Sequence, residues 1–264
     1  MHRFLPIIVI VALAACKEPA TESTSDGHTI KRGFFENGDL QAEVIYNKEG
    51  KKDGLTRSFY ENGRVRAEYN YVNGSKEGMT RNYYKEGGVS SEINYTNNEK
   101  HGEYIKYYKE GGKYTVSTYV NGIQDGERSV YNRSGTLKST MYYSGGRPLP
   151  GAKRFKPNGE ERNEMQMRFT LDDKTALTGK AKLYVELDEK LPEVKFVYGV
   201  VDEQGKFKDG FQYPLNMDSN GRGFIEYTKS AYSMVMDKVE VVAIAQDRDQ
   251  QVYLISGRYN LVLD

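Results

Sequence analysis

The stretch LTRSFYENGRVRAEYNYVNGSKEG, residues 55–78, decides the fold of this chain, because it is one complete copy of a unit that returns every 24 residues. Columns of like residues over four units show the period: Gly54, Gly78, Gly102 and Gly126; Gly63, Gly87, Gly111 and Gly135; Phe59, Tyr83, Tyr107 and Tyr131; Tyr71, Tyr95, Tyr119 and Tyr143. Such columns in phase indicate an array of stacked structural repeats.

Each unit has the features of a two-stranded β-hairpin. Residues 55–60 are the first predicted strand, and residues 65–71 are the second, in which apolar and polar side chains alternate as they do in a half-buried strand. Asn62-Gly63 lies between them and is a strong turn signal. One hairpin alone is marginally stable. We therefore expect the units to stack edge to edge as a single-layer sheet, here called the ladder, over residues 30–160.

Tyrosine columns of the ladder are the candidate binding face. Neighbouring strand residues point to opposite sides of a sheet, so the Phe59 column and the Tyr60 column are expected on opposite faces. The tyrosines fit two roles, because cross-strand pairs stabilise a sheet and tyrosine is enriched at interfaces. A single layer cannot bury both faces. The predicted binding face consists of Tyr60, Tyr84, Tyr108, Tyr71, Tyr95, Tyr119 and Tyr143.

The repeat resembles the MORN-repeat variant of bacterial proteins, a family that includes the YwqK-type antitoxin-like proteins. The residues that carry the resemblance are YYKEGG at 83–88, EKHG at 99–102 and YYKEG at 107–111. It covers residues 33–160 and implies a hairpin ladder that acts as a scaffold for protein binding or membrane association. Two units have Glu-Gly-Gly in place of Asn-Gly, and Asn98 replaces a glycine, so those turns are expected to differ in detail. FKPNG at 155–159 reads as a degenerate half-unit that caps the ladder.

The period stops near residue 162, and longer strands without phase follow. Predicted strands cover residues 165–171, 180–187, 194–201, 223–227, 238–245, 252–257 and 259–263. Strands at this short spacing predict a β-sandwich over residues 161–264, either immunoglobulin- or transthyretin-like. The fold class is therefore all-β throughout.

The N-terminus reads as a lipoprotein signal peptide over residues 1–15. A positive start and a short apolar run precede Leu13-Ala14-Ala15-Cys16, which resembles the lipobox of bacterial lipoproteins. The resemblance implies lipidation of Cys16, the single cysteine of the chain, and hence a membrane anchor. The alternative is an ordinary secretory signal with an incidental cysteine. Residues 16–29 lack large apolar side chains over most of their length and are predicted to be a flexible tether. Lys17 follows the cysteine where an Asp would favour inner-membrane retention, so the outer membrane of a Gram-negative bacterium is the expected location.

The charged residues do not point to nucleic acid or to catalysis. Lys and Arg number 38 against 37 Asp and Glu, so the chain has no basic excess that would favour nucleic acid. His101 lies in a repeat turn and no triad accompanies it. The NMDSNG stretch at 216–221 resembles the start of a calcium loop, but Tyr227 stands where a bidentate Glu is required. We predict a turn there, no enzyme activity, no cofactor and no metal.

The expected function is that of a membrane-anchored scaffold, which binds a partner protein of the cell envelope through its repeat surface. Two alternatives stay open. Tyrosine faces also suit glycan or cell-wall binding, and the family resemblance also implies a toxin-neutralising, immunity-like role.

Overall fold

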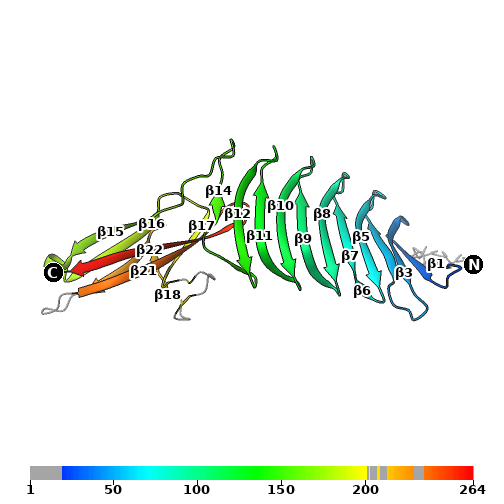
Figure 1. Cartoon of the computed structure of the whole chain (residues 1–264), viewed down its shortest axis with the longest axis horizontal. Helices are drawn as coiled ribbons and strands as arrows, with labels where there is room; N and C mark the ends of the chain where they lie inside the picture. Colours follow the sequence, from blue (N-terminus) through cyan, green and yellow to red (C-terminus); the bar gives the residue numbers. More distant parts are fainter. Residues whose placement is uncertain (1–19, 201, 203–206, 209–212, 229–234, 264) are drawn as a thin grey trace, which may run out of the picture.

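The computed structural model describes residues 20–200, 202, 207–208, 213–228 and 235–263. Within these residues the chain is all-β, as predicted, with one long sheet and two smaller ones arranged along the long axis (Figure 1). The single helix of the described part is the short α1 (Thr175–Thr178). No helix in this part is both long and apolar enough to cross a membrane. The predicted signal peptide, residues 1–15, and Cys16 lie outside the described residues.

The ladder is an antiparallel sheet of 14 strands in the described chain, and its strands follow one another in sequence order except for two short ones. Its strands are β1 (Ala20–Ser23), β2 (Thr29–Phe34), β3 (Leu40–Tyr46), β4 (Gly54–Phe59), β5 (Val65–Val72), β6 (Ser75–Lys76), β7 (Gly78–Tyr83), β8 (Val89–Thr96), β9 (Glu99–Tyr107), β10 (Lys113–Val120), β11 (Ile123–Tyr131), β12 (Leu137–Ser144), β13 (Arg147–Pro148) and β14 (Lys153–Arg154).

Two kinds of turn alternate along the ladder. In the first kind of turn, the Tyr60 amide donates a hydrogen bond to the Arg64 carbonyl, and the Gly63 amide donates one to the Tyr60 carbonyl. Gly63 adopts a φ of 77°. The second kind is a two-residue turn with both residues at positive φ, as at Asn73 (49°) and Gly74 (93°). Asn98, expected to change its turn, adopts a φ of 70° and keeps the same geometry. The Glu-Gly-Gly turns also keep the hydrogen bonds of the Asn-Gly turns.

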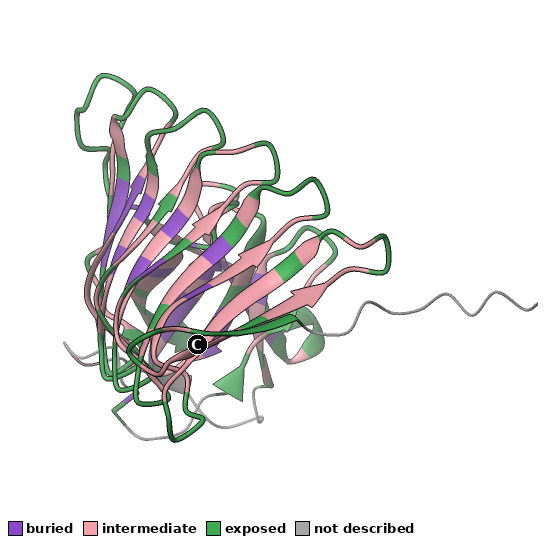
Figure 2. Cartoon of the chain, turned by 90° about the vertical axis from the view of Figure 1, so that its right-hand side faces the viewer, coloured by how far each residue is buried: buried purple, intermediate pink, exposed green. Residues whose placement is uncertain are grey.

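The two faces of the ladder carry different kinds of side chain. One face, here called the small-residue face, buries many short side chains at the strand centres, together with Ile93, Val130 and Met141; the short ones are Thr56, Ala67, Thr80, Ser91, Thr115, Ser117 and Ser139. Buried segments lie within the strands, whereas the turns are exposed (Figure 2). The other face carries Arg–Glu pairs such as Arg57–Glu68, whose Nε and Oε1 atoms are 3.1 Å apart. Because the ladder is a single layer, short side chains on its small-residue face are buried only where larger neighbouring side chains cover them.

The ladder begins earlier than predicted. Ala20–Ser23 forms β1 and pairs with β2, Ala20 opposite Arg32 and Ser23 opposite Thr29. Arg32 also bonds the carboxylate of Glu22 at 2.9 Å. The prediction of a flexible tether over residues 16–29 is therefore wrong for residues 20–29. Backbone pairing with β2 orders residues 20–23, which have no large apolar side chain to bury.

The far end of the ladder has the expected cap. β14 pairs with β12, the Phe155 amide donates to the Lys138 carbonyl, and a bridge joins Phe155 to Glu161. The Lys156 amide then donates to the Glu160 carbonyl, and the Gly159 amide to that of Lys156, as in the first kind of turn. This is the predicted sixth half-unit. The predicted domain boundary at 160/161 falls within this capping hairpin.

Two sheets of four strands each follow in the described residues, and they pack face to face as a sandwich. Their strands are β15 (Met167–Lys174), β16 (Lys180–Leu187), β17 (Glu193–Tyr198), β18 (Tyr213–Pro214), β19 (Asn216–Met217), β20 (Gly223–Thr228), β21 (Val235–Gln246) and β22 (Val252–Leu263). The core between the sheets includes Leu183, Phe196, Val241 and Leu261, each at most 2 % exposed.

The strand order of the sandwich is immunoglobulin-like. One sheet runs β15-β16-β20-β19 and the other β18-β17-β21-β22. With the strands lettered in chain order, these are the orders A-B-E-D and C′-C-F-G of an immunoglobulin-type sandwich. Of the two predicted alternatives, the immunoglobulin-like one therefore matches the strand order.

Two details of the sandwich bear on the sequence predictions. Residues 252–263 form one continuous strand, paired with β21 along its whole length, where two strands were predicted. At the NMDSNG stretch the turn is confirmed. Asp218 accepts hydrogen bonds from the backbone amides of Asn220 and Arg222 and pairs with the Arg222 guanidinium at 2.8 Å.

The β21–β22 hairpin fixes the sandwich against the last ladder units. Arg128 of β11 donates to the Asp249 carbonyl at 2.9 Å and contacts the side chain of Gln251, which is fully buried. The carboxylate of Asp249 accepts a hydrogen bond from Tyr114 at 3.2 Å and pairs with Lys138. The hairpin tip thus lies on the end of the ladder and joins segments far apart in sequence.

Candidate functional site

The Tyr60 column links each unit to the next. The phenolic hydroxyls of Tyr60 and Tyr108 donate to the backbone carbonyls of Tyr83 and Tyr131, both at 2.7 Å. Tyr84 makes the equivalent bond to the carbonyl of Tyr107 at 2.5 Å. In the next unit Asn132 replaces the tyrosine and accepts the backbone N–H of Thr136 instead. This part of the predicted binding face is therefore half-buried, with its hydroxyls already engaged.

The Phe59 column extends the Arg–Glu pairs of the opposite face. Glu68 accepts a hydrogen bond from the Tyr83 hydroxyl at 2.7 Å and pairs with Arg57. The hydrogen bond from the Tyr83 hydroxyl is the main cause of the lowered pKa of the Glu68 carboxyl, and the Arg57 guanidinium lowers it further. Burial, together with the Glu68 carboxylate, raises the pKa of Tyr83 to about 12. Tyr107 repeats the arrangement one unit on, with Glu92 in place of Glu68.

The Tyr71 column occupies the small-residue face, opposite the glycine column. Tyr71 pairs across the strands with Gly54, and the register repeats at Tyr95 with Gly78 and at Tyr119 with Gly102. The glycines are explained by the backbone, because Gly54 and Gly78 have φ values of 106° and 75°. Gly102 also has a φ of 82°, a conformation that residues with a side chain rarely adopt.

A lysine lies over each of these rings. The ammonium of Lys52 is 5.0 Å from the centroid of the Tyr71 ring, that of Lys76 is 5.2 Å from Tyr95, and that of Lys100 is 5.0 Å from Tyr119. Such distances are those of a cation–π contact. We call the six residues Tyr71, Tyr95, Tyr119, Lys52, Lys76 and Lys100 the tyrosine–lysine stripe. Its members repeat at roughly 10 Å, the width of two paired strands.

Polar groups of the stripe have spare bonding capacity. Among the described residues, Lys52, Lys76 and Lys100 form no ion pair, and the hydroxyls of Tyr71, Tyr95 and Tyr119 have no hydrogen-bond partner. Burial raises the pKa of each of these tyrosines, so the hydroxyls stay protonated and can donate. The stripe therefore offers a regular row of donors and positive charges to a ligand rich in acceptors.

The stripe ends where the sandwich begins. Gln124 occupies the next lysine position, and Tyr143 interacts with Arg128, which also holds the β21–β22 hairpin. The last tyrosine of the predicted face is thus part of the contact between ladder and sandwich. Of the seven tyrosines predicted, three lie in the stripe, three link adjacent units, and Tyr143 lies at the junction.

The lysines of the stripe were missed in the sequence analysis. Their signal was present, since Lys52, Lys76 and Lys100 keep the 24-residue period. Only the cross-strand register shows that they cover the tyrosine rings. His101, weighed as a catalytic candidate, is exposed in β9. Among the described residues no group of three or more His, Cys, Asp or Glu side chains is arranged to hold a metal ion.

Comparison with known protein families agrees with the architecture of the ladder. Residues 52–73 and 124–144 match the family model described as the MORN repeat variant. The two matched segments are separated by units of the same period and the same hairpin geometry. No curated protein sequence matches the chain. The ladder therefore contains MORN repeats of the variant kind at these two places.

Proposed function

We propose that this chain is a lipoprotein of the cell envelope, anchored through a lipid on Cys16, whose ladder binds a partner protein through the tyrosine–lysine stripe. The observation that carries the proposal is the row of lysines and phenolic hydroxyls, in phase with the repeat, that have no ion-pair or hydrogen-bond partner within the described part of the chain. A row of this kind suits an extended, acidic segment of a partner, because carboxylates accept hydrogen bonds from both groups.

The architecture supports a role as a spacer. The N-terminal end of the ladder and the sandwich lie at opposite ends of the long axis (Figure 1). The sheet path from β1 to β13 spans roughly 50 Å at the usual spacing between strands. An anchor ahead of β1 would place the sandwich far from the membrane, and the stripe would run between the two.

A protein partner fits the stripe better than a glycan. Sugars bind tyrosine by stacking on the face of the ring, and in the stripe each ring already has a lysine ammonium about 5 Å from its centroid. Stacking would first have to displace the lysine. Charge complementarity with an acidic segment uses the lysines where they are.

The test compares two triple variants of the full chain. Lys52→Gln, Lys76→Gln and Lys100→Gln together remove the charge of the stripe. Replacement of Lys85, Lys113 and Lys195 by Gln removes the same charge from exposed positions elsewhere. Crosslinking from membranes should capture an envelope protein with the wild type and with the control variant, and lose it with the stripe variant.

Anchoring is tested separately by Cys16→Ala, which should release the chain from the membrane fraction. Equal capture by the stripe and control variants would refute the role of the stripe. Capture of cell-wall or capsular sugar without any protein would favour the glycan alternative.

A further inference from the structure

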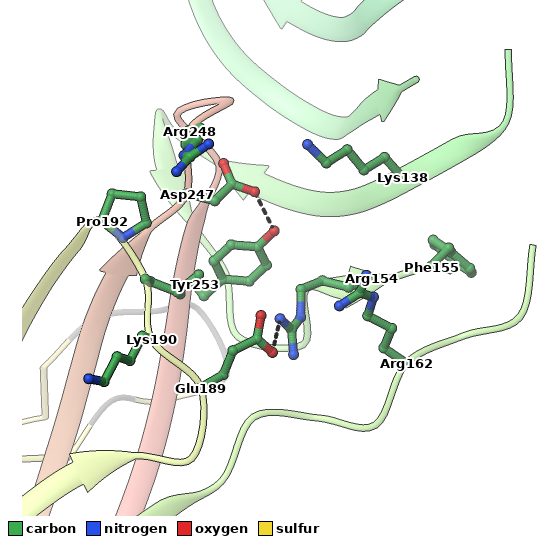
Figure 3. A pocket seen from close by; sticks show the side chains of 11 residues that line it. Lys138, Arg154, Phe155, Arg162, Glu189, Lys190, Pro192, Asp247, Arg248 and Tyr253 are labelled. Atoms are coloured by element: carbon green, nitrogen blue, oxygen red, sulfur yellow. Dashed lines mark hydrogen bonds and ion pairs between the residues drawn. The ribbon is translucent and has the colours of Figure 1, made fainter. Parts of the chain in front are cut away.

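The junction between ladder and sandwich contains a pocket of about 560 Å³. Arg154 and Arg162 reach it from the capping half-unit of the ladder, whereas Lys190 and Arg248 come from loops of the sandwich (Figure 3). Both parts of the molecule therefore contribute to its wall. The pocket lies apart from the tyrosine–lysine stripe and shares no residue with it.

The lining of this pocket is strongly basic. It has five cationic side chains and two acidic ones, a formal charge of +3 in a chain whose total is +1. Both acids are engaged. Glu189 pairs with Arg154 at 2.6 Å. Asp247 accepts the Tyr253 hydroxyl at 2.9 Å and two backbone amides of its own turn.

Three cations of the pocket have no counter-charge among the residues that the structure describes. Within the described chain, Arg162, Lys190 and Arg248 form no ion pair. They come from two different parts of the fold and line the same cavity, so the lining carries positive charge that an anion would offset. Lysines and arginines that are scattered over the surface do not line a common cavity in this way.

The pocket also has an aromatic and apolar part. The Tyr253 ring is 3 % exposed and lies 5.8 Å from the Arg154 guanidinium carbon. Phe155, Leu191 and Pro192 complete the lining. The volume is within the usual range for small-ligand sites, roughly 300–1,000 Å³. A ligand that fills the pocket would therefore combine an anionic group with a compact, less polar body.

We propose that the junction pocket, through Arg162, Lys190 and Arg248, binds a phosphorylated small molecule or headgroup. The guanidinium groups of Arg162 and Arg248 suit a phosphate because each presents several N–H donors in one plane. Since these cations come from both parts of the molecule, the bound anion would bridge the ladder and the sandwich. The proposal is independent of the partner bound by the stripe.

Calorimetric titration of the full chain tests the proposal with defined probes. Glucose 1-phosphate and inorganic phosphate represent free phosphates, unmodified glucose is the neutral control, and phosphatidylglycerol vesicles represent a lipid headgroup. Arg162→Gln, Lys190→Gln and Arg248→Gln are combined in one variant. Replacement of Arg66, Lys85 and Arg168 by Gln gives a control with the same charge change at exposed positions outside the pocket.

We expect at least one phosphate probe to bind wild type and control alike, glucose not to bind, and the pocket variant to bind about ten-fold or more weakly. The bound probe should also raise the Tm of wild type and not that of the pocket variant. Binding of the free phosphates identifies a soluble ligand, and binding of the vesicles alone identifies a lipid headgroup. Absence of binding to every phosphate probe, or equal binding by the pocket and control variants, would overturn the proposal.

Discussion

Replacement of Tyr108 by Phe tests whether the Tyr60 column holds the repeats together. The change deletes one hydroxyl, whose hydrogen bond to the Tyr131 carbonyl is 2.7 Å long, and keeps the ring that packs 5.0 Å from Tyr114. A hydrogen bond of this kind contributes about 0.5–1.5 kcal/mol net. We therefore expect the free energy of unfolding to fall by about 1 kcal/mol, which corresponds to roughly 2–4 °C in Tm for a chain of this size.

The matched control is Tyr119→Phe, the same chemical change on the same ladder. The hydroxyl of Tyr119 has no hydrogen-bond partner within the described residues. Its removal should change stability by less than about 0.5 kcal/mol. Urea denaturation gives both free energies, and amide hydrogen exchange in β11 and β12 shows whether the loss is local to the linked unit.

The combined variant with Tyr60, Tyr84 and Tyr108 all changed to Phe should lose about three times the single effect, since the bonds join different units. Equal losses of stability for Tyr108→Phe and Tyr119→Phe would contradict the assignment of the Tyr60 column as the link between units. That result would mean that the hydroxyls act through general solvation and not through bonds between units.

Three further predictions concern the glycine column, the carboxylates and the junction. Gly102→Ala, at a φ of 82°, should cost about 1–2 kcal/mol in urea denaturation; no loss would show that the strand relaxes. The pKa of the Glu68 carboxyl is lower in the folded chain than in the unfolded chain. Ionised Glu68 therefore stabilises the fold above the unfolded pKa, and this contribution is lost as the pH falls through the folded pKa. Urea midpoints between about pH 6 and pH 3 should therefore fall more for wild type than for Glu68→Gln; parallel curves would contradict this. Arg128→Ala, which removes the contacts to Gln251 and to the Asp249 carbonyl, should cost about 2–3 kcal/mol and increase the radius of gyration in X-ray scattering; an unchanged radius would show that other contacts hold the junction.

The repeat and its hairpins could be read from the sequence because they depend on local chemistry. Asn62-Gly63 favours a tight turn wherever it stands, and alternation over residues 65–71 assigns the side chains to two faces. Because the sequence repeats every 24 residues, the strands, turns and faces assigned in one unit apply to the next unit as well. For the same reason β16 (Lys180–Leu187) matches its predicted bounds, since its alternation is regular.

Predictions failed where ordering comes from a partner distant in sequence or from backbone pairing alone. Ala20–Ser23 has little strand character, and only the pairing with β2 orders it. Residues 252–263 contain Gly257 and form one strand where two were predicted. The close approach of Met167 and Phe169 explains this glycine, because an added Cβ would lie 2.5 Å from the Met167 sulfur.

The all-β class, the 24-residue ladder and the columns of like residues could be predicted from the sequence, because turn chemistry and alternation act over a few residues. Which tyrosine hydroxyls donate a hydrogen bond and which have no partner among the described residues could be learned only from the three-dimensional arrangement. That difference depends on the register between strands, which places the Tyr60 hydroxyl on a backbone carbonyl and a lysine over the Tyr71 ring. The junction, too, was decided in three dimensions, because Arg128 and Asp249 meet only when the sandwich lies on the end of the ladder.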